Sequence, residues 1–218
     1  MKARLGVIPL GTVNVFAKEL GIPTRLARAW QVIQAGHERL VDVPFAEFIN
    51  LQGATERRHF AQLAGAGLDA RAIELVSWEL KKKLGVFAYV VAGLKAWREK
   101  PSAILAEADG RRANGSLVLI GNGRFYGGKL PFFPNAQPDD GKFDVVVFPK
   151  VTVGTVLRWT WSAATGSNAA SRGATSWQTE SLRLTSVAGV PFELEGDLVG
   201  RLPVKVGILP RALRILAS

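Results

Sequence analysis

The sequence predicts an α+β fold in which a β-rich sandwich or barrel follows a short α/β segment. Residues 1–36 combine one apolar run with two stretches of helical periodicity, whereas the chain from about residue 40 onward contains many short apolar runs between turn residues. The 23 glycines and 11 prolines are typical of many turns and short strands. We therefore expect a partial α/β unit over residues 1–40, a β-rich domain over 41–204 and C-terminal strands over 205–218 that return to the first unit.

The N-terminal unit is expected to be a strand followed by two helices. Leu5–Ile8 is a short apolar run that predicts a buried strand, and Val13–Leu20 predicts a helix. A second helix is expected to begin at the N-cap Thr24 and to end at Gly36. Its apolar residues recur at helical spacing: Leu26, Ala29, Trp30 and Ile33.

The rest of the chain predicts mainly antiparallel strands with two or three helices. Asp109-Gly110 is a strong hairpin signal, and the Ser/Gly/Ala-rich Gly166–Ala174 predicts a mobile loop. The expected helices are Asp69–Lys83, Gly85–Glu99 and Thr152–Ala164. The expected strands are Leu40–Val43, Glu47–Leu51, His59–Ala64, Ala103–Ala108, Ser116–Ile120, Phe143–Phe148, Leu182–Thr185, Phe192–Glu195, Val204–Leu209 and Leu213–Leu216.

Composition excludes some chemistries and favours anionic partners. The absence of cysteine excludes disulfides and thiolate metal sites, and only two histidines exclude a His-rich metal centre. The formal net charge of +10 favours phosphorylated ligands, nucleic acid or an anionic membrane surface. The basic residues are scattered without an arginine-rich run, so we expect no nucleic-acid partner, and a solvated surface explains the charge equally well.

No segment of the sequence predicts a membrane span. The longest clean apolar stretch, Gly85–Leu94, is too short for a bilayer, which takes about 20 residues. The first residues, Met1–Arg4, lack the apolar core of a signal peptide. We therefore expect a cytoplasmic protein that is soluble or bound peripherally to a membrane.

Three segments carry candidate chemistry. In Leu5–Asn14 an apolar run enters a Gly-Thr turn and then a helix, which favours phosphate binding, although any strand-to-helix junction uses such residues. In Asn135–Asp144 two adjacent acids occupy a Pro/Gly turn that could hold a hard cation or be a plain surface turn. In Phe192–Asp197 two carboxylates flank Gly196, as for a general base or metal ligand, and a hairpin turn explains them equally well.

Taken in order, these segments resemble the diacylglycerol kinase catalytic family, which includes YegS-like bacterial lipid kinases and sphingosine kinases. Leu5–Pro23 is similar to the family's Gly-Thr-x-Asn-Asp segment, and Phe60–Ala70 is similar to its Gly-Phe-Asp-Ala segment. Gly121–Gly128 matches Gly-Asn-x-x-x-x-Gly-Gly. Asp139–Gly141 and Glu195–Asp197 then follow in the family's order, so the resemblance covers nearly the whole chain.

The resemblance implies a lipid kinase that uses ATP and Mg²⁺. Its fold would be a β-rich C-terminal domain beside the remnant of an α/β nucleotide-binding domain, with the active site between them. Its reaction would transfer the γ-phosphoryl group of ATP to the hydroxyl of a lipid such as diacylglycerol or a sphingoid base. A peripheral anionic membrane surface is a further expected partner, and a homodimer is left open.

The resemblance also assigns roles to particular residues. It implies nucleotide contacts at Gly11, Thr12 and Asn14. It implies a Mg²⁺ site with an associated acid network, formed by Asp42, Gln137, Asp140 and Lys142, in which Gln137 and Lys142 offer backbone oxygens. The family's Asp-Gly-Glu base motif falls on Glu195–Asp197, so Asp197 takes the base position, with Glu195 as the second candidate.

The sequence departs from the family at three points. Val15 replaces an acid, and the Asp-Gly-Glu order is inverted, so the base position carries the shorter Asp197. The family's Gly-Gly-Asp-Gly-Thr phosphate loop would precede Leu5 and occurs nowhere in these 218 residues. We therefore expect little or no kinase activity from this chain alone.

Two other functions remain as alternatives. One is a lipid- or membrane-binding module without catalysis, and the other is a small-molecule kinase similar to NAD kinases. Val153–Trp161 is a candidate membrane-contacting helix, with core packing as the alternative. Aromatic residues that could line a lipid cleft, contact a membrane or fill the core are Trp78, Phe87, Tyr89, Trp97, Trp159 and Trp161.

Overall fold

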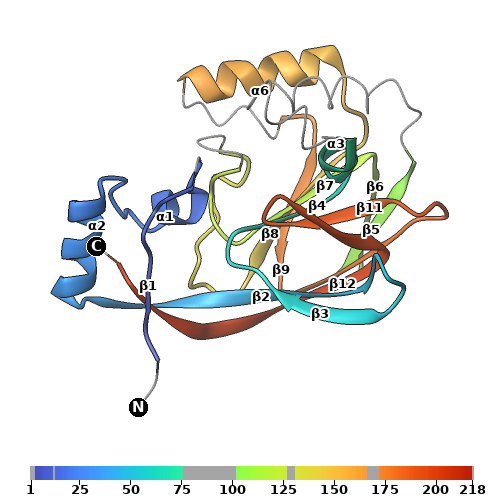
Figure 1. Cartoon of the computed structure of the whole chain (residues 1–218). Coiled ribbons are helices and arrows are strands. Elements are labelled where there is room, and N and C mark those ends of the chain that lie inside the picture. Colours follow the sequence, from blue (N-terminus) through green and yellow to red (C-terminus); the bar gives the residue numbers. More distant parts are fainter. Residues whose placement is uncertain (1–2, 12, 76–101, 127–130, 166–171, 218) are drawn as a thin grey trace.

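The computed structural model describes residues 3–11, 13–75, 102–126, 131–165 and 172–217. Their strands form one 12-stranded sheet that curves into a nearly closed, barrel-like sandwich with few helices (Figure 1). The strand order along the main path is β6-β5-β10-β12-β11-β4-β7-β8-β9, and β1, β2 and β3 lie off this path. The expected α+β class with a β-rich sandwich is confirmed.

The elements have the following bounds. The strands are β1 (Leu5–Gly6), β2 (Glu38–Asn50), β3 (Thr55–His59), β4 (Leu63–Gly67), β5 (Ile104–Ala108), β6 (Arg111–Gly115), β7 (Leu117–Gly121), β8 (Phe143–Phe148), β9 (Thr175–Thr179), β10 (Ser181–Thr185), β11 (Pro191–Leu194) and β12 (Asp197–Leu216). The helices are α1 (Val15–Glu19), α2 (Leu26–Ala35), α3 (Leu68–Leu75) and α6 (Val153–Thr165).

The long antiparallel pair of β2 and β12 runs through the whole fold. It extends from Gly200 opposite Asn50 to Leu216 opposite Glu38, with register shifts after Arg201 and Leu209. Each strand was expected as two shorter strands. The prolines of β12 do not end the strand, because a sheet tolerates proline at an irregularity, and the two register shifts of β12 fall at its prolines.

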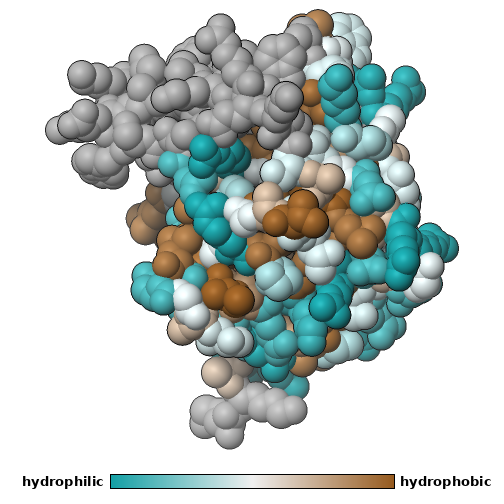
Figure 2. Space-filling model, turned by 90° about the vertical axis from the view of Figure 1, so that its right-hand side faces the viewer, coloured by the Kyte–Doolittle hydropathy of each residue, from teal (hydrophilic) through white to brown (hydrophobic). Residues whose placement is uncertain are grey.

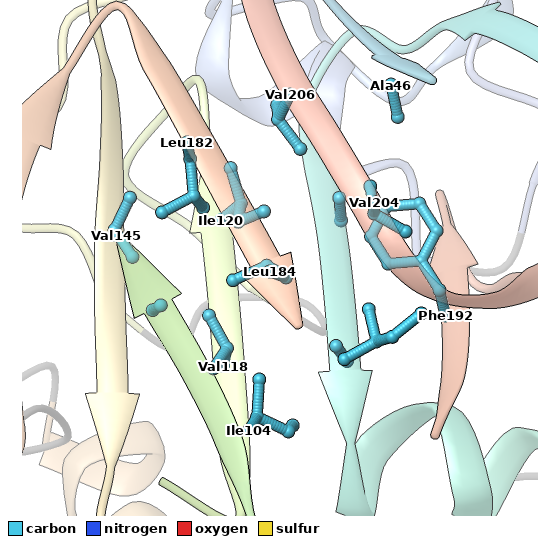
Figure 3. Close-up of a cluster of buried hydrophobic side chains, with 14 of the residues drawn as sticks. Ala46, Ile104, Val118, Ile120, Val145, Leu182, Leu184, Phe192, Val204 and Val206 are labelled. Carbon is cyan, nitrogen blue, oxygen red and sulfur yellow. The ribbon is translucent and has the colours of Figure 1, made fainter. Parts of the chain in front are cut away.

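The buried apolar side chains of the described residues form three clusters. The largest fills the inside of the curved sheet, where side chains from facing strands point toward one another (Figure 3). The second lies beneath α6, where Trp159 meets the rings of Phe132 and Phe148 edge-on, each at 5.4 Å between centroids. The third joins α1 and α2 to the far ends of β2 and β12, and it includes Ala17, Ala29, Val41 and Ile215.

Parts of the N-terminal prediction were wrong. The strand β1 covers only Leu5–Gly6. Leu5 is 43% exposed rather than buried, because β1 pairs with a single strand, the C-terminal end of β12. The N-cap of α2 is Arg25 instead of Thr24. The expected apolar stripe of α2 buries Ala29 but leaves Leu26 and Trp30 exposed.

Other differences concern strands and undescribed residues. The strands β6 and β9 were not predicted, and the predicted strand His59–Ala64 spans the gap between β3 and β4. The helix Gly85–Glu99, the second half of Asp69–Lys83 and most of the predicted mobile loop lie outside the described residues. So do four of the six aromatic candidates: Trp78, Phe87, Tyr89 and Trp97.

The described surface mixes apolar and hydrophilic groups. Figure 2 shows one face, on which apolar side chains gather near the middle with hydrophilic ones around them. Within the described ranges, no helix is both long enough and apolar enough to cross a membrane.

Candidate active site at the junction of the N-terminal segment and the sheet

A pocket of about 370 Å³ lies between the N-terminal segment and the hairpin that joins β11 to β12. It brings together three of the predicted site residues, Gly11, Asn14 and Glu195. Thr12, the fourth residue predicted here, lies outside the described residues. The full lining is Val7, Ile8, Pro9, Leu10, Gly11, Val13, Asn14, Val15, Phe16, Ala17, Leu63 and Glu195.

Asn14 closes the turn on one side of the pocket. It adopts a left-handed conformation (φ 52°) as the N-cap of α1. Its Oδ1 accepts a hydrogen bond from the Gly11 N–H (2.8 Å), and its Nδ2 donates to the carbonyls of Gly11 (2.5 Å) and Pro9 (3.4 Å). A Cβ on Gly11 would lie only 3.0 Å from Asn14 Oδ1, so a larger residue there would require Asn14 to shift. Asn14 thus shapes the rim of the pocket.

Glu195 occupies a two-residue hairpin turn on the other side. Leu194 pairs with Asp197, so Glu195 and Gly196 are the two central residues, and both have positive φ (54° and 89°). Positive φ at both central residues defines the type I′ turn that matches strand twist. Glutamate is an unusual residue at such a position, and backbone outliers of this kind concentrate at functional sites.

Backbone amides hold the Glu195 carboxylate in place. Its Oε1 accepts hydrogen bonds from the N–H groups of Ala61 (2.7 Å), Gln62 (2.7 Å) and Leu63 (3.4 Å). Burial raises the pKa of Glu195, and the hydrogen bonds from the three amides act against this rise. The carboxylate is therefore fixed at the pocket.

Asp197 stands elsewhere on the same hairpin. It is the exposed first residue of β12 and is not among the residues that line the pocket. Its charge contributes to the raised pKa of Arg58, for which the hydrogen bond to Glu56 is the main cause. Of the two predicted base candidates, the structure therefore brings Glu195 and not Asp197 to the pocket.

Asp42 ties the predicted metal turn to the long strands. It is buried (1% exposed), and its Oδ2 and Oδ1 accept hydrogen bonds from the N–H groups of Gly141 and Arg211, each at 2.7 Å. The Asp42 N–H donates to the Pro138 carbonyl, also at 2.7 Å. This single side chain thus joins β2, the 138–141 turn and the irregular part of β12.

Asp140 lies in that turn and belongs to a small carboxylate cluster. Its Oδ1 accepts from the Lys142 N–H (2.9 Å). The Gln178 Nε2 donates to Asp140 Oδ2 (3.2 Å) and to Asp144 Oδ2 (3.1 Å). Burial raises the pKa of Asp144 to about 6, the charge of Asp140 adds to the rise, and the hydrogen bond from Gln178 opposes it. Sequence reasoning missed Gln178 because β9, which places it opposite Asp144, was not predicted.

The donors in the turn suit a hard cation. Mg²⁺ is usually bound through one or two carboxylates with further oxygen ligands. The Asp140 carboxylate and the carbonyls of Gln137 and Lys142 offer donors of this type. In the described part of the chain, no group of three or more His, Cys, Asp or Glu side chains is placed to hold a metal, so backbone oxygens would have to complete the shell.

A buried amide links the turn to the pocket. The Asn122 Nδ2 donates to the carbonyls of Asp42 (3.2 Å) and Ala61 (3.0 Å), and the Asn122 N–H donates to the Gln62 carbonyl (2.9 Å). Ala61 and Gln62 in turn donate to Glu195. Hydrogen bonds therefore run continuously from the 138–141 turn to the carboxylate at the pocket.

The helix α1 is anchored next to this chain of hydrogen bonds. Glu19, which is 7% exposed, accepts from the backbone N–H (2.7 Å) and from the Nε (3.0 Å) of Arg124. A Cβ on Gly123 would lie 2.6 Å from Gln62 Nε2 and 2.7 Å from Glu19 Cγ, so glycine permits this close approach. Sequence reasoning did not single out Glu19, whose partner is 105 residues away.

Comparisons with known proteins identify both parts of the chain. Residues 62–217 match the YegS C-terminal NAD kinase beta sandwich-like domain, and residues 1–46 match the diacylglycerol kinase catalytic domain. The fold and these matches place the chain in the class of diacylglycerol-kinase-like proteins. Because the first match covers well over half of the residues, the chain belongs to the YegS-like lipid kinase family.

Curated relatives match nearly the whole of this chain. An uncharacterized protein of Synechocystis sp. is 29% identical over 98% of this chain and 49% of its own length. A protein of Staphylococcus carnosus named diacylglycerol kinase is 27% identical over 93% of this chain and 64% of its own length. The chain thus spans about half to two thirds of these relatives.

Solved structures show the same fold. A structure described as a diacylglycerol kinase from Bacillus anthracis str. Sterne has a TM-score of 0.72 and 24% identity, covering 100% of this chain and 70% of that one. A yeast NADH kinase complexed with NADH has a TM-score of 0.50 and 8% identity, covering 90% of this chain and 50% of the other.

Proposed function

We propose that the pocket between the N-terminal segment and Glu195 is part of the reaction site of a lipid kinase. The enzyme would transfer the γ-phosphoryl group of ATP to the hydroxyl of diacylglycerol or a sphingoid base. The observation that carries the proposal is that Glu195 and the Gly11–Asn14 turn line one pocket, although they lie at opposite ends of the chain. The matches to the kinase families support it independently.

The two sides of the pocket have different roles in this proposal. The turn that contains Gly11, Thr12 and Asn14 would contact the nucleotide, because a turn before a helix presents backbone groups to phosphate. Asp140, with the carbonyls of Gln137 and Lys142, would hold Mg²⁺, which supplies positive charge for phosphate oxygens. Asp42 would keep that turn in position through its bonds to Gly141 and Arg211.

The hairpin would serve the acceptor. A general base acts best when its pKa lies near the working pH, and burial shifts the pKa of Glu195 upward in that direction. Glu195 would accept the proton of the lipid hydroxyl, with its Oε1 fixed by the amides of residues 61–63. Asp197, which the resemblance favours, is the second candidate for this role.

The proposal includes peripheral membrane contact through α6. Diacylglycerol does not readily leave a bilayer, so its kinase must reach the interface. Trp159 of α6 packs against the rings of Phe132 and Phe148, as the core-packing alternative predicts. Val156, Leu157 and Trp161 of the same helix are 47%, 65% and 64% exposed. Exposed apolar residues that include Trp favour the headgroup level of a membrane.

A fluorescent ATP analogue in the presence of Mg²⁺ tests the nucleotide side. We expect saturable binding that Asn14→Ala weakens about tenfold, because the variant loses the hydrogen bonds that shape the turn. The control Asn114→Ala changes the same residue type on exposed β6 and should leave binding unchanged. Equal binding by both variants, or no binding by the wild type, would contradict the nucleotide assignment.

Transfer of labelled phosphate tests the acceptor side. The wild type, Glu195→Gln and Asp197→Asn are compared on diacylglycerol in mixed micelles and on NADH as a soluble acceptor. Because these 218 residues contain no Gly-Gly-Asp-Gly-Thr phosphate loop, we expect at most weak labelling of lipid by the wild type. Glu195→Gln should lose that labelling, with unchanged nucleotide affinity. Labelling of NADH alone would favour the NAD-kinase-like function, and nucleotide-independent lipid binding without transfer would favour the non-catalytic module.

A further inference from the structure

A second cavity, of about 400 Å³, shares no lining residue with the first. It is formed by the tip of the β5–β6 hairpin together with β10 and β12. Its lining is rich in cations: Glu107, Ala108, Asp109, Gly110, Arg111, Arg112, Ser181, Leu182, Arg183, Lys205 and Val206. Neither the predicted site residues nor the family resemblance assigns a role to this cavity.

Strand register sets the charges around the cavity. Arg183 of β10 lies directly opposite Lys205 of β12 on one side and Glu107 of β5 on the other. Glu107 in turn lies opposite Arg112 and forms an ion pair with it, with 2.9 Å between Oε1 and Nε. The acid next to Arg183 is therefore already paired with the cation on its other side.

The same arrangement recurs beside Lys205. Lys205 lies opposite Glu47 of β2, and Glu47 lies opposite Arg57 of β3. Arg57 pairs with Glu47 at 3.9 Å and also covers the ring of Phe45. Arg183 and Lys205 are thus neighbouring cations between two acids that are each paired outward.

Arg183 and Lys205 place two positive charges directly opposite each other on neighbouring strands. Like charges directly opposite in an antiparallel pair destabilise the sheet. Throughout the described residues, no ion pair involves Arg183, Lys205 or Arg111, and all three residues are exposed. An anion between the two strands would remove the repulsion and supply the missing counter-charge.

We infer that Arg183 and Lys205 form a binding site for a phosphate group, with Arg111 and Ser181 completing the cavity. A guanidinium contacts two phosphate oxygens at once, and an ammonium group adds a point charge. Ser181 lies two residues before Arg183, so its hydroxyl is on the same face of β10. A cavity of this size accepts a phosphomonoester with a small organic group. The phosphate could belong to a soluble metabolite or to a lipid headgroup.

Titration with sn-glycerol 3-phosphate, followed by amide NMR signals, tests the site with a soluble probe. We expect saturable shifts at residues 181–183 and 205–206 of the wild type. Arg183→Gln/Lys205→Gln should weaken binding about tenfold or more, since two charged contacts are lost. The control Arg28→Gln/Lys150→Gln removes the same net charge from exposed positions outside the cavity and should change the affinity less than about twofold.

Vesicles of phosphatidylcholine with phosphatidic acid provide the lipid arm. Binding to these vesicles that the cavity variant loses and the control keeps identifies a headgroup as the source of the phosphate, whereas binding of the soluble probe alone identifies a metabolite. Without ligand, the cavity variant should unfold at the same temperature as the wild type or higher, because it lacks the repulsion. Equal loss of binding in both double variants, or no saturable binding to either probe, overturns the inference.

Discussion

Replacement of Asp42 by asparagine tests whether one buried carboxylate holds the 138–141 turn to the sheet. In the wild type, the two carboxylate oxygens each accept a backbone hydrogen bond at 2.7 Å, from Gly141 and Arg211. Asparagine retains one acceptor oxygen and turns an NH₂ group toward the other N–H donor. The variant therefore loses one charge-assisted hydrogen bond and leaves one of the two donors, both of which lie in part-buried hydrogen bonds, without an acceptor.

The expected loss follows from these two effects. A hydrogen bond to a charged group contributes about 1.5–3 kcal/mol, and a buried unsatisfied donor costs about 1–3 kcal/mol. Because the carboxylate is nearly inaccessible to water, little of this loss is recovered by hydration, and we expect a decrease of about 3 kcal/mol in unfolding free energy. For a chain of this size, that lowers Tm by about 6–12 °C.

Calorimetry and amide hydrogen exchange measure the effect. Asp109→Asn is the matched control, because Asp109 is exposed at a type I′ turn where asparagine is equally suited. It should change stability by less than about 0.5 kcal/mol. Exchange at the Gly141 and Arg211 amides should accelerate in Asp42→Asn more than in the rest of the sheet. A Tm of Asp42→Asn within the range of the control, or unchanged protection of those two amides, would refute the reasoning.

Two further predictions concern pH and membranes. Burial raises the pKa of Asp144 to about 6 in the folded chain. Ionised Asp144 therefore lowers the stability of the folded chain above pH 6, and this cost disappears as the pH falls toward 4. The pKa shift corresponds to roughly 3 kcal/mol, which solvent access reduces to about 1–2 kcal/mol. Asp144→Asn should therefore be more stable than the wild type at pH 7.5 and lose this advantage at pH 4 in urea unfolding; a difference independent of pH would contradict this. Leu157→Ser/Trp161→Ser should weaken binding to phosphatidylglycerol vesicles roughly tenfold, while Leu26→Ser/Trp30→Ser, an equally spaced exposed pair on α2, should not. Equal losses in co-sedimentation would count against α6 as the membrane surface.

The fold was predictable where local patterns determine it. The strand β8 has the predicted bounds Phe143–Phe148, because a mainly apolar run, interrupted only by Asp144 and flanked by turn residues, suits a buried strand. Asp109 and Gly110 both have positive φ in the predicted hairpin turn. The strands β6 and β9 escaped prediction because Arg111–Gly115 and Thr175–Thr179 contain few apolar residues, and pairing with neighbours determines their conformation.

The candidate site was less predictable because its contacts join distant parts of the chain. The partners of Asp42 lie 99 and 169 residues away, so no local pattern indicates that both of its oxygens are used. The sequence singled out Asp42 only through the family resemblance. The hydrogen bonds give it a physical role, which is to position the turn that contains Asp140.

The hairpin at the pocket shows why a motif alone does not assign the base. Aligned on its central glycine, Glu195-Gly196-Asp197 gives the base position to Asp197. The type I′ turn, however, makes Glu195 a turn residue and Asp197 the first residue of β12. Glu195 then reaches the amides of residues 61–63 beside the pocket, and the extra methylene of glutamate lengthens that reach. A base in the inverted motif would therefore act from the turn itself, which is why Glu195→Gln and Asp197→Asn must be compared in the same assay.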